Sequence, residues 1–254
     1  MFQKGFSAIF VIASIVLTLL VGGFFLLKPK STFQKKPEVQ VNPTVNPAAS
    51  PQNTDEPPLK LKSIGVNFED FKFTKAKLQF NRLFMGFGFY IPGGDGTHPA
   101  KYNPQPTFIV PLGTPVRSLV DGVVAAVPQV WSGDYSIQVT ETGKMEKWVY
   151  ETEHVKNPLV KVGDRVKAGQ IIAEASDFDK GNSGLGAVEI GILKGGNPPR
   201  HVCPFAYLDE SIKEEILKKI TAFFKSWEDY IGDSTLYPET YLVPGCLTLD
   251  EIEG

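Results

Sequence analysis

The sequence predicts a mainly β domain whose short strands form an antiparallel sheet or sandwich, followed by one amphipathic helix. Short apolar runs recur between turn residues, and strands of this length at close, regular spacing are typical of antiparallel folds. The expected strands cover 107–110, 115–119, 122–127, 136–140, 147–150, 170–173 and 187–193. Aromatic residues also alternate with polar residues over 64–91, which predicts further strand structure before the glycine-rich loop at 92–96.

A C-terminal helix is expected over 211–231. Apolar residues recur there at helical spacing, so one face is hydrophobic while the other mixes lysines with acidic residues. Ser211 and Glu214 match a capping box, Asp209 is an alternative cap, and Gly232 is expected to end the helix. Because the polar face lacks a basic stripe, we expect the helix to dock on the domain rather than on a membrane.

The N-terminal region contains an expected membrane anchor. Residues 6–27 carry no charge, and a helix of this length spans about 33 Å, enough for the hydrocarbon core of a bilayer. No small-residue cleavage site follows closely, so an uncleaved single-pass anchor is preferred to a signal peptide. Residues 28–58 contain seven prolines among polar residues and are interpreted as a solvated linker. This leaves 59–254 for the folded domain.

The charge distribution bears on partners and on orientation. The 254-residue chain has a formal net charge of −2, but residues 1–36 contain five lysines and no acidic residue, leaving 21 basic and 28 acidic residues in 37–254. An acidic domain lacks the basic surface of a nucleic-acid binder, so we expect no nucleic-acid partner. Four of the five lysines follow the expected anchor, and the positive-inside rule alone would therefore place the C-terminal part in the cytoplasm.

Several motifs, in the right order over about 100–208, resemble peptidase family M23, the LytM and lysostaphin type of zinc endopeptidase that cuts peptidoglycan cross-bridges. The motifs are Pro111-Leu112-Gly113-Thr114-Pro115-Val116, Ser132-Gly133-Asp134-Tyr135, Glu153-His154-Val155, the turn pair over 162–170, Val188-Glu189-Ile190 and Pro204-Phe205-Ala206-Tyr207-Leu208. The resemblance implies an M23-like β fold with peptidoglycan or a cell-wall hydrolase as partner. It also implies an extracytoplasmic C-terminal domain, which we prefer to the orientation given by the lysine count.

The resemblance also implies a site that has lost its metal. Asn103 and Thr107 fall where the family has its His-x-x-x-Asp ligands, and Leu185 and Ala187 fall at the His-x-His positions. A zinc hydrolase needs three protein ligands and an open position for water. We therefore expect no cofactor and a non-catalytic module that binds peptidoglycan or regulates a hydrolase. His154 is interpreted as a vestigial catalytic residue, and the former metal groove is expected to be lined by Asn103, Thr107, Leu185, Ala187 and Glu189.

Three alternatives remain. An active zinc endopeptidase would need substitute ligands such as His98, His154 and Glu189. The start Gln3-Lys4-Gly5-Phe6-Ser7 resembles a prepilin cleavage region, although Phe10 stands where that family has glutamate, and suggests an envelope or pilus-associated structural protein. The turn pair also resembles the lipoyl and biotinyl carrier hairpin, in which Lys180 would be the modified residue.

Two cysteines, Cys203 and Cys246, flank the expected helix. In an oxidising compartment they could form a disulfide that closes a loop of about 44 residues. In a reducing cytoplasm two buried thiols are expected instead. The state of this pair therefore tests the orientation of the domain.

Overall fold

The computed structural model describes residues 55–93, 99–178 and 184–254, all within one compact unit, Asn53–Gly254. The expected anchor over 6–27 and nearly all of the linker lie outside the described residues, as do His98 and Lys180. No helix in the described part of the chain is long and apolar enough to cross a membrane.

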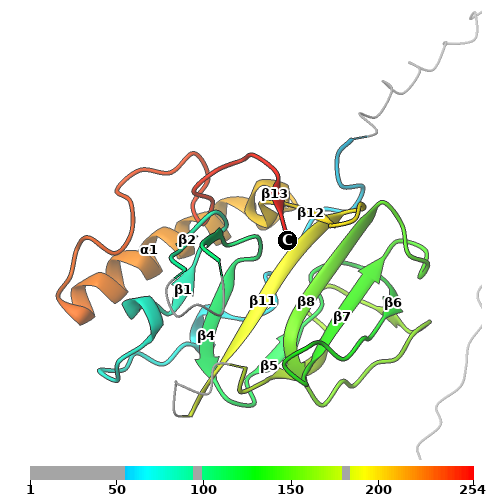
Figure 1. Cartoon of the computed structure of the whole chain (residues 1–254), viewed down its shortest axis with the longest axis horizontal. Coiled ribbons are helices and arrows are strands. Elements are labelled where there is room, and N and C mark those ends of the chain that lie inside the picture. Colours follow the sequence, from blue (N-terminus) through cyan, green and yellow to red (C-terminus); the bar gives the residue numbers. More distant parts are fainter. Residues whose placement is uncertain (1–54, 94–98, 179–183) are drawn as a thin grey trace, which may run out of the picture. The chain divides into compact units, whose positions relative to one another are not determined.

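The centre of the domain is an antiparallel sheet of eleven strands, counted over the described residues (Figure 1). The main path of the sheet runs β1-β4-β11-β8-β7-β6-β9, with β5, β10, β12 and β13 attached at its sides. The strands are β1 (Phe84–Met85), β4 (Thr107–Pro111), β5 (Pro115–Arg117), β6 (Gly122–Ala126), β7 (Tyr135–Thr140), β8 (Trp148–Lys156), β9 (Arg165–Val166), β10 (Ile171–Ala175), β11 (Leu185–Lys194), β12 (Arg200–Val202) and β13 (Ile252–Glu253). A separate hairpin pairs β2 (Tyr90–Ile91) with β3 (Lys101–Tyr102). The predicted mainly β, antiparallel fold with one C-terminal helix is confirmed.

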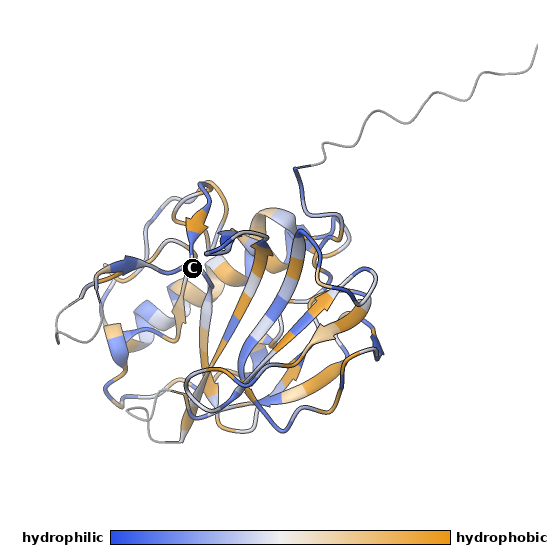
Figure 2. Cartoon of the chain, turned by 45° about the vertical axis from the view of Figure 1, so that its right-hand side comes forward, coloured by the Kyte–Doolittle hydropathy of each residue, from blue (hydrophilic) through white to orange (hydrophobic). Residues whose placement is uncertain are grey.

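The two longest strands, β8 and β11, lie side by side at the middle of the sheet (Figure 1). Both carry hydrophobic and hydrophilic bands in turn (Figure 2), because successive side chains point to opposite faces. The sequence prediction ended the first of these strands at Tyr150, but β8 continues to Lys156. The polar run Glu151–His154 misled that prediction. Glu151, Glu153 and His154 line a cleft, and Thr152 is buried.

The aromatic stretch 64–91 is not the run of strands that its alternation predicts. It forms two short 3₁₀ turns, η1 (Phe68–Asp70) and η2 (Gln79–Asn81), and only the two-residue strands β1 and β2. Its rings instead fill the layer between the sheet and the C-terminal helix. The ring of Phe71 lies 4.5 Å from that of Phe223, and Phe84 stacks on Phe224 at 5.3 Å.

The C-terminal helix α1 (Lys213–Ile231) is confirmed, beginning two residues later than predicted. It buries Ile220, Phe223, Phe224 and Trp227 against the domain and ends at Gly232, which has a left-handed φ of 83°. The predicted capping box is wrong. The N-cap residue is Ile212, which provides no side-chain cap. The backbone N–H and the hydroxyl of Ser211 both donate hydrogen bonds to Oδ1 of Asp209, so the Asp209 carboxylate caps a turn just before the helix.

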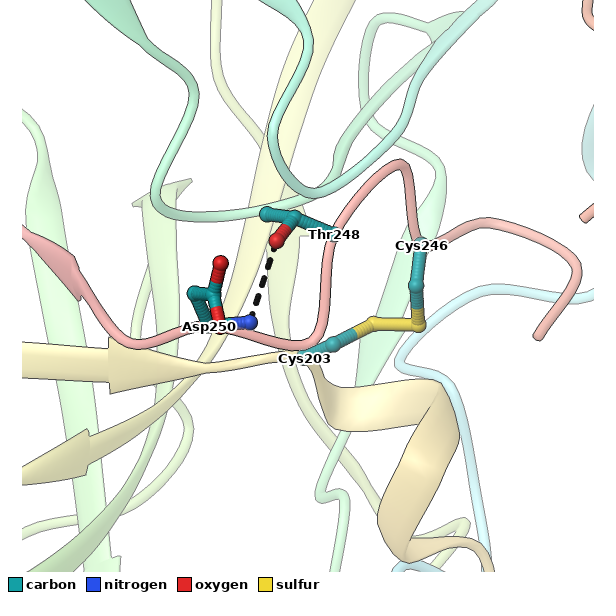
Figure 3. The surroundings of a disulfide bond; sticks show 4 residues. All are labelled: Cys203, Cys246, Thr248 and Asp250. Atoms are coloured by element: carbon teal, nitrogen blue, oxygen red, sulfur yellow. Dashed lines mark hydrogen bonds between the residues drawn. A yellow bond between two sulfur atoms is a disulfide. The ribbon is translucent and has the colours of Figure 1, made fainter. Parts of the chain in front are cut away.

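Cys203 and Cys246 form a disulfide with a Cα–Cα distance of 6.0 Å (Figure 3). Cys203 lies just before the 3₁₀ turn η3 (Pro204–Tyr207), and Cys246 lies in the segment that returns after α1. Both residues are buried. The bond therefore fastens the returning C-terminal segment, including the turn at Thr248 and Asp250, to the end of the sheet.

Candidate binding cleft

A polar cleft of about 400 Å³ lies beside the two longest strands. Three glutamates line it: Glu151 and Glu153 of β8, and Glu189 of β11, which is the direct cross-strand partner of Glu153. Lys101 of β3 and Trp131, whose side chain is 79% exposed, also line the cleft. The cleft thus combines carboxylates with an accessible aromatic ring, a composition suited to a polar ligand.

His154 reaches this cleft because β8 carries a bulge. Tyr135 of β7 pairs with Val155, but Ile137 pairs with Thr152, so two residues of β8 oppose one of β7. His154 has a φ of 58°, a left-handed conformation that histidine adopts more readily than most residues. In a regular strand its side chain would point away from the glutamates, and the bulge re-aims it. The imidazole consequently lines the same cleft as the carboxylates.

Two carboxylates flank the buried imidazole of His154. Its Nδ1 lies 3.2 Å from Oδ2 of Asp134, and its Nε2 lies 3.8 Å from Oε2 of Glu189. The hydroxyls of Ser132 and Ser176 donate short hydrogen bonds to Asp134. Burial alone would raise the pKa of Asp134, but these hydrogen bonds and the imidazole outweigh it and hold that pKa below its usual value. Asp134 is therefore a stable anion that orients the imidazole.

Asn103 and Thr107, at two of the family's ligand positions, are bonded to each other. Nδ2 of Asn103 donates to Oγ1 of Thr107 at 3.3 Å, and both side chains are 3% exposed. Oγ1 of Thr107 lies 3.1 Å from Oε1 of Glu189. Burial raises the pKa of Glu189, while His154 and Thr107 act against that rise. These three residues thus form one hydrogen-bonded group next to the imidazole, whose Nε2 lies 3.8 Å from Glu189.

Ala187 and Leu185 occupy different surroundings. Ala187 lines a small cavity of about 120 Å³ next to the cleft, together with Thr107, Glu189 and mainly apolar neighbours such as Ile109. Leu185 pairs with Pro111 at the start of β11 and does not line the cleft or this cavity. The structure therefore brings Asn103, Thr107, Ala187, Glu189 and His154 together and leaves Leu185 apart.

This set of side chains does not fit a zinc ion. The positions that would hold the metal present an amide, a hydroxyl and a methyl group, whereas protein zinc sites use imidazole, thiolate and carboxylate groups. Within the described ranges, no three His, Cys, Asp or Glu side chains are arranged so that they could hold a metal. The ring of Phe178 also covers one face of the His154 imidazole, with the ring centroids 3.5 Å apart.

The glutamates of β8 differ in how their charge is compensated. Glu151 accepts hydrogen bonds from Gln105 at 3.0 Å, Ser136 at 2.5 Å and Gln138 at 2.7 Å. For Glu153, burial and repulsion from the neighbouring carboxylates raise the pKa to about 8. Glu153 is therefore mostly protonated at neutral pH and can donate a hydrogen bond into the cleft.

His201 lines the same cleft from β12 and is 3% exposed. Its Nδ1 has no hydrogen-bond partner among the described residues. Burial lowers the pKa of this imidazole to about 4, so it is neutral at physiological pH. His201 is buried within β12 and was not among the expected site residues.

Several residues that line the cleft or contact His154 were missed by sequence reasoning. Asp134 was noted only as part of a hairpin motif, and Glu151, Glu153 and Phe178 were not proposed as site residues. The signal for the two glutamates was present, since they are two residues apart on a strand and therefore share a face. Phe178 gave no such signal, because its contact with His154 joins the end of β10 to a bulge in another strand.

Residues 106–199 match the family model described as peptidase family M23. No curated protein matches the chain. Among solved structures, the chain is similar to the catalytic domain of lysostaphin from Staphylococcus simulans, with 24% identity over 44% of this chain and 79% of that chain and a TM-score of 0.35. The chain is also similar to the longer lysostaphin chain from Staphylococcus simulans, with 25% identity over 44% of this chain and a TM-score of 0.36. The match covers only 43% of that longer chain.

Two other solved structures are similar at comparable levels. The catalytic domain of the prophage-encoded M23 protein EnpA from Enterococcus faecalis is 23% identical over 56% of this chain and 90% of that chain, with a TM-score of 0.34. A zinc-containing peptidase from Vibrio cholerae is 22% identical over 53% of this chain and 37% of that chain, with a TM-score of 0.39. These TM-scores lie below 0.5, and the assignment rests on the family match. Residues 106–199 of this chain are therefore a peptidase family M23 domain.

Proposed function

We propose that this protein is a non-catalytic M23 module, held outside the cytoplasm by an N-terminal anchor, that binds peptidoglycan or regulates a cell-wall hydrolase. The observation that carries the proposal is that Asn103, Thr107 and Ala187 stand where the resemblance places metal-binding groups, beside a cleft that retains His154. Without a cation, a lone imidazole cannot polarise an amide and also lower the pKa of an attacking water.

The contacts of His154 support a binding role. Its ring nitrogens are engaged by Asp134 and Glu189, and one of its faces is covered by Phe178. The cleft still presents carboxylates, amides and the exposed ring of Trp131 to a ligand. Such groups can hydrogen-bond to and stack on a polar polymer without breaking it.

The extracytoplasmic location rests on the disulfide. A bond between Cys203 and Cys246 forms and persists in oxidising compartments and is rare in the cytosol. The uncharged run over 6–27 and the proline-rich residues after it would hold the domain away from a bilayer. Protease added to intact cells tests this placement: a cleaved C-terminal domain supports it, and a protected one contradicts it.

The binding function is tested by co-sedimentation of the full chain with purified peptidoglycan, combined with an assay for released muropeptides. We expect binding without release. Trp131→Ala should lower the bound fraction severalfold, because it removes the exposed ring from the cleft. Met145→Ala is the matched control, since Met145 is also exposed, at 63%, but lies outside the cleft.

The alternative, a zinc endopeptidase with substitute ligands, is favoured by the closeness of His154 and Glu189. It predicts muropeptide release that stops on addition of a chelator and is lost in His154→Ala. Release with these properties would overturn the proposed function. Equal binding by the Trp131 and Met145 variants would show that the cleft is not the binding surface.

A further inference from the structure

A second cavity, of about 440 Å³, lies between α1, the segment from β1 to β2 and the chain that returns after the helix. In Figure 1 this returning chain runs from α1 over β1 and β2, and the hydrogen bond from Leu247 to the carbonyl of Phe87 joins the two segments. Aromatic side chains dominate its lining, including Phe84, Phe224 and Tyr241. Its size and apolar lining are typical of small-molecule sites.

Arg82 is the one charged residue among the described residues that line this mainly apolar cavity. The guanidinium donates hydrogen bonds to the backbone carbonyls of Phe80 and Leu236, and it lies 4.7 Å from the ring centroid of Phe89 and 5.5 Å from that of Tyr237. A guanidinium has five N–H donors, so two backbone acceptors leave donors available. Its bonds hold the side chain in one place, facing the cavity.

The positive charge of Arg82 has no paired carboxylate among the described residues. Glu228 and Asp233 favour the charge without forming an ion pair with it. Their carboxylates instead accept hydrogen bonds from the backbone N–H of Tyr237 and the hydroxyl of Thr235, respectively. Burial lowers the pKa of Arg82, which shows that the charge is poorly solvated. A half-buried, unpaired cation is unfavourable unless a negative charge joins it.

We propose that this cavity binds a small apolar carboxylate, with the carboxylate on the Arg82 guanidinium and the apolar body against the aromatic rings. Charge complementarity selects the head group, because guanidinium and carboxylate form paired hydrogen bonds. The apolar lining selects the body, since burial of apolar surface drives its entry. This site is separate from the M23 cleft and does not depend on the function proposed for it.

Isothermal titration of the full chain tests the proposal with decanoate and its uncharged analogue 1-decanol, both below their aggregation concentrations. We expect decanoate to bind at least about tenfold more tightly than decanol, as for a charge-assisted pair. Arg82→Met should remove most of this difference, and Arg82→Lys should retain part of it. Equal affinity for the two probes in the unmodified protein, or no binding of either, would overturn the proposal.

Because Arg82 also bonds to two backbone carbonyls, its variants can lose binding through loss of folding. Leu247→Trp provides an independent test, since Leu247 lines the cavity and a larger side chain would fill it while Arg82 stays in place. Leu249→Trp is the matched control. Leu249 is 48% exposed, close to the 43% of Leu247, but it does not line the cavity. We expect the first variant to lose decanoate binding and the second to keep it; equal behaviour of the two would contradict the site.

Discussion

The imidazole of His154 and the ring of Phe178 are stacked, with centroids 3.5 Å apart and an angle of 11° between their planes. His154 belongs to a bulge in β8, whereas Phe178 follows β10, so the stack joins separate parts of the sheet. It covers one face of the histidine, while Asp134 and Glu189 flank its edges. The imidazole is thereby held as a packed structural group within a cleft that remains open.

This packing predicts a structural role for His154. We expect His154→Ala to lower the free energy of unfolding by about 1–3 kcal/mol, because it removes the ring stacked on Phe178 and one of the hydrogen-bond partners of the Asp134 carboxylate. His154→Asn should cost less, since asparagine tolerates the left-handed backbone and retains an amide donor. Urea unfolding of the full chain measures both values. Equal stability of the alanine variant and the unmodified protein would show that the stack and the hydrogen bond contribute nothing.

The raised pKa of Glu153 predicts that the free energy of unfolding falls at alkaline pH. Its pKa is raised from an ordinary value of 4.5 to about 8, so the folded state holds the proton more tightly than the unfolded state. Its contribution to stability is therefore present in full below pH 4.5 and is lost as the pH rises towards 8. Glu153→Gln removes this dependence, and at pH 8.5 the variant should be more stable than the unmodified protein by at least about 1 kcal/mol.

Thermal unfolding of both proteins across this pH range checks the Glu153 prediction. Glu239→Gln, at an exposed site, is the control and should leave the pH profile unchanged. Parallel pH profiles for Glu153→Gln and the unmodified protein would mean that Glu153 is not held in its protonated form by the fold.

Because of the disulfide, we expect the stability of the folded domain to depend strongly on whether Cys203 and Cys246 are oxidised or reduced. A bond that closes a loop of about 44 residues stabilises a protein by about 4 kcal/mol in the chain-entropy treatment. We expect reductant, or the double replacement of Cys203 and Cys246 by alanine, to lower the melting temperature by several degrees. Alkylation of the denatured but unreduced protein, followed by mass measurement, should find no free thiol. Two free thiols in protein isolated from its native source would argue against the extracytoplasmic location.

The sequence was sufficient for the main architecture because the turn motifs and short strands recur in a fixed order. It was not sufficient for 64–91, where alternating aromatics such as Phe71 and Phe84 fill a layer against α1 instead of forming strands. The structure places Asn103, Thr107, Ala187 and Glu189 close together. Leu185 shares a face of β11 with Ala187 and Glu189, but it lies at the start of the strand, opposite Pro111, and so falls outside the cleft.

The properties of the ionisable residues in the cleft could not be predicted from the sequence, because they depend on contacts between residues far apart in the chain. The raised pKa of Glu153 arises from burial and from the charges of Glu151, Glu189 and Asp134, which come from three different strands or loops. The position of His154 depends on a bulge that is visible only in the pairing with β7. The cation in the second cavity likewise becomes notable only when the structure shows that Arg82 has no carboxylate partner within residues 55–93, 99–178 and 184–254.

The proposed function requires that the domain does not bind zinc at the family's metal positions, and zinc analysis tests this requirement most directly. The full chain would be equilibrated with zinc, dialysed and analysed for bound metal, alongside a variant that carries Asn103→His, Thr107→Asp and Ala187→His. We expect well under one zinc ion per unmodified chain and about one per chain of the variant, since three ligands suffice for a zinc site with an open position. One tightly bound zinc ion in the unmodified protein, lost in His154→Ala, would contradict the account.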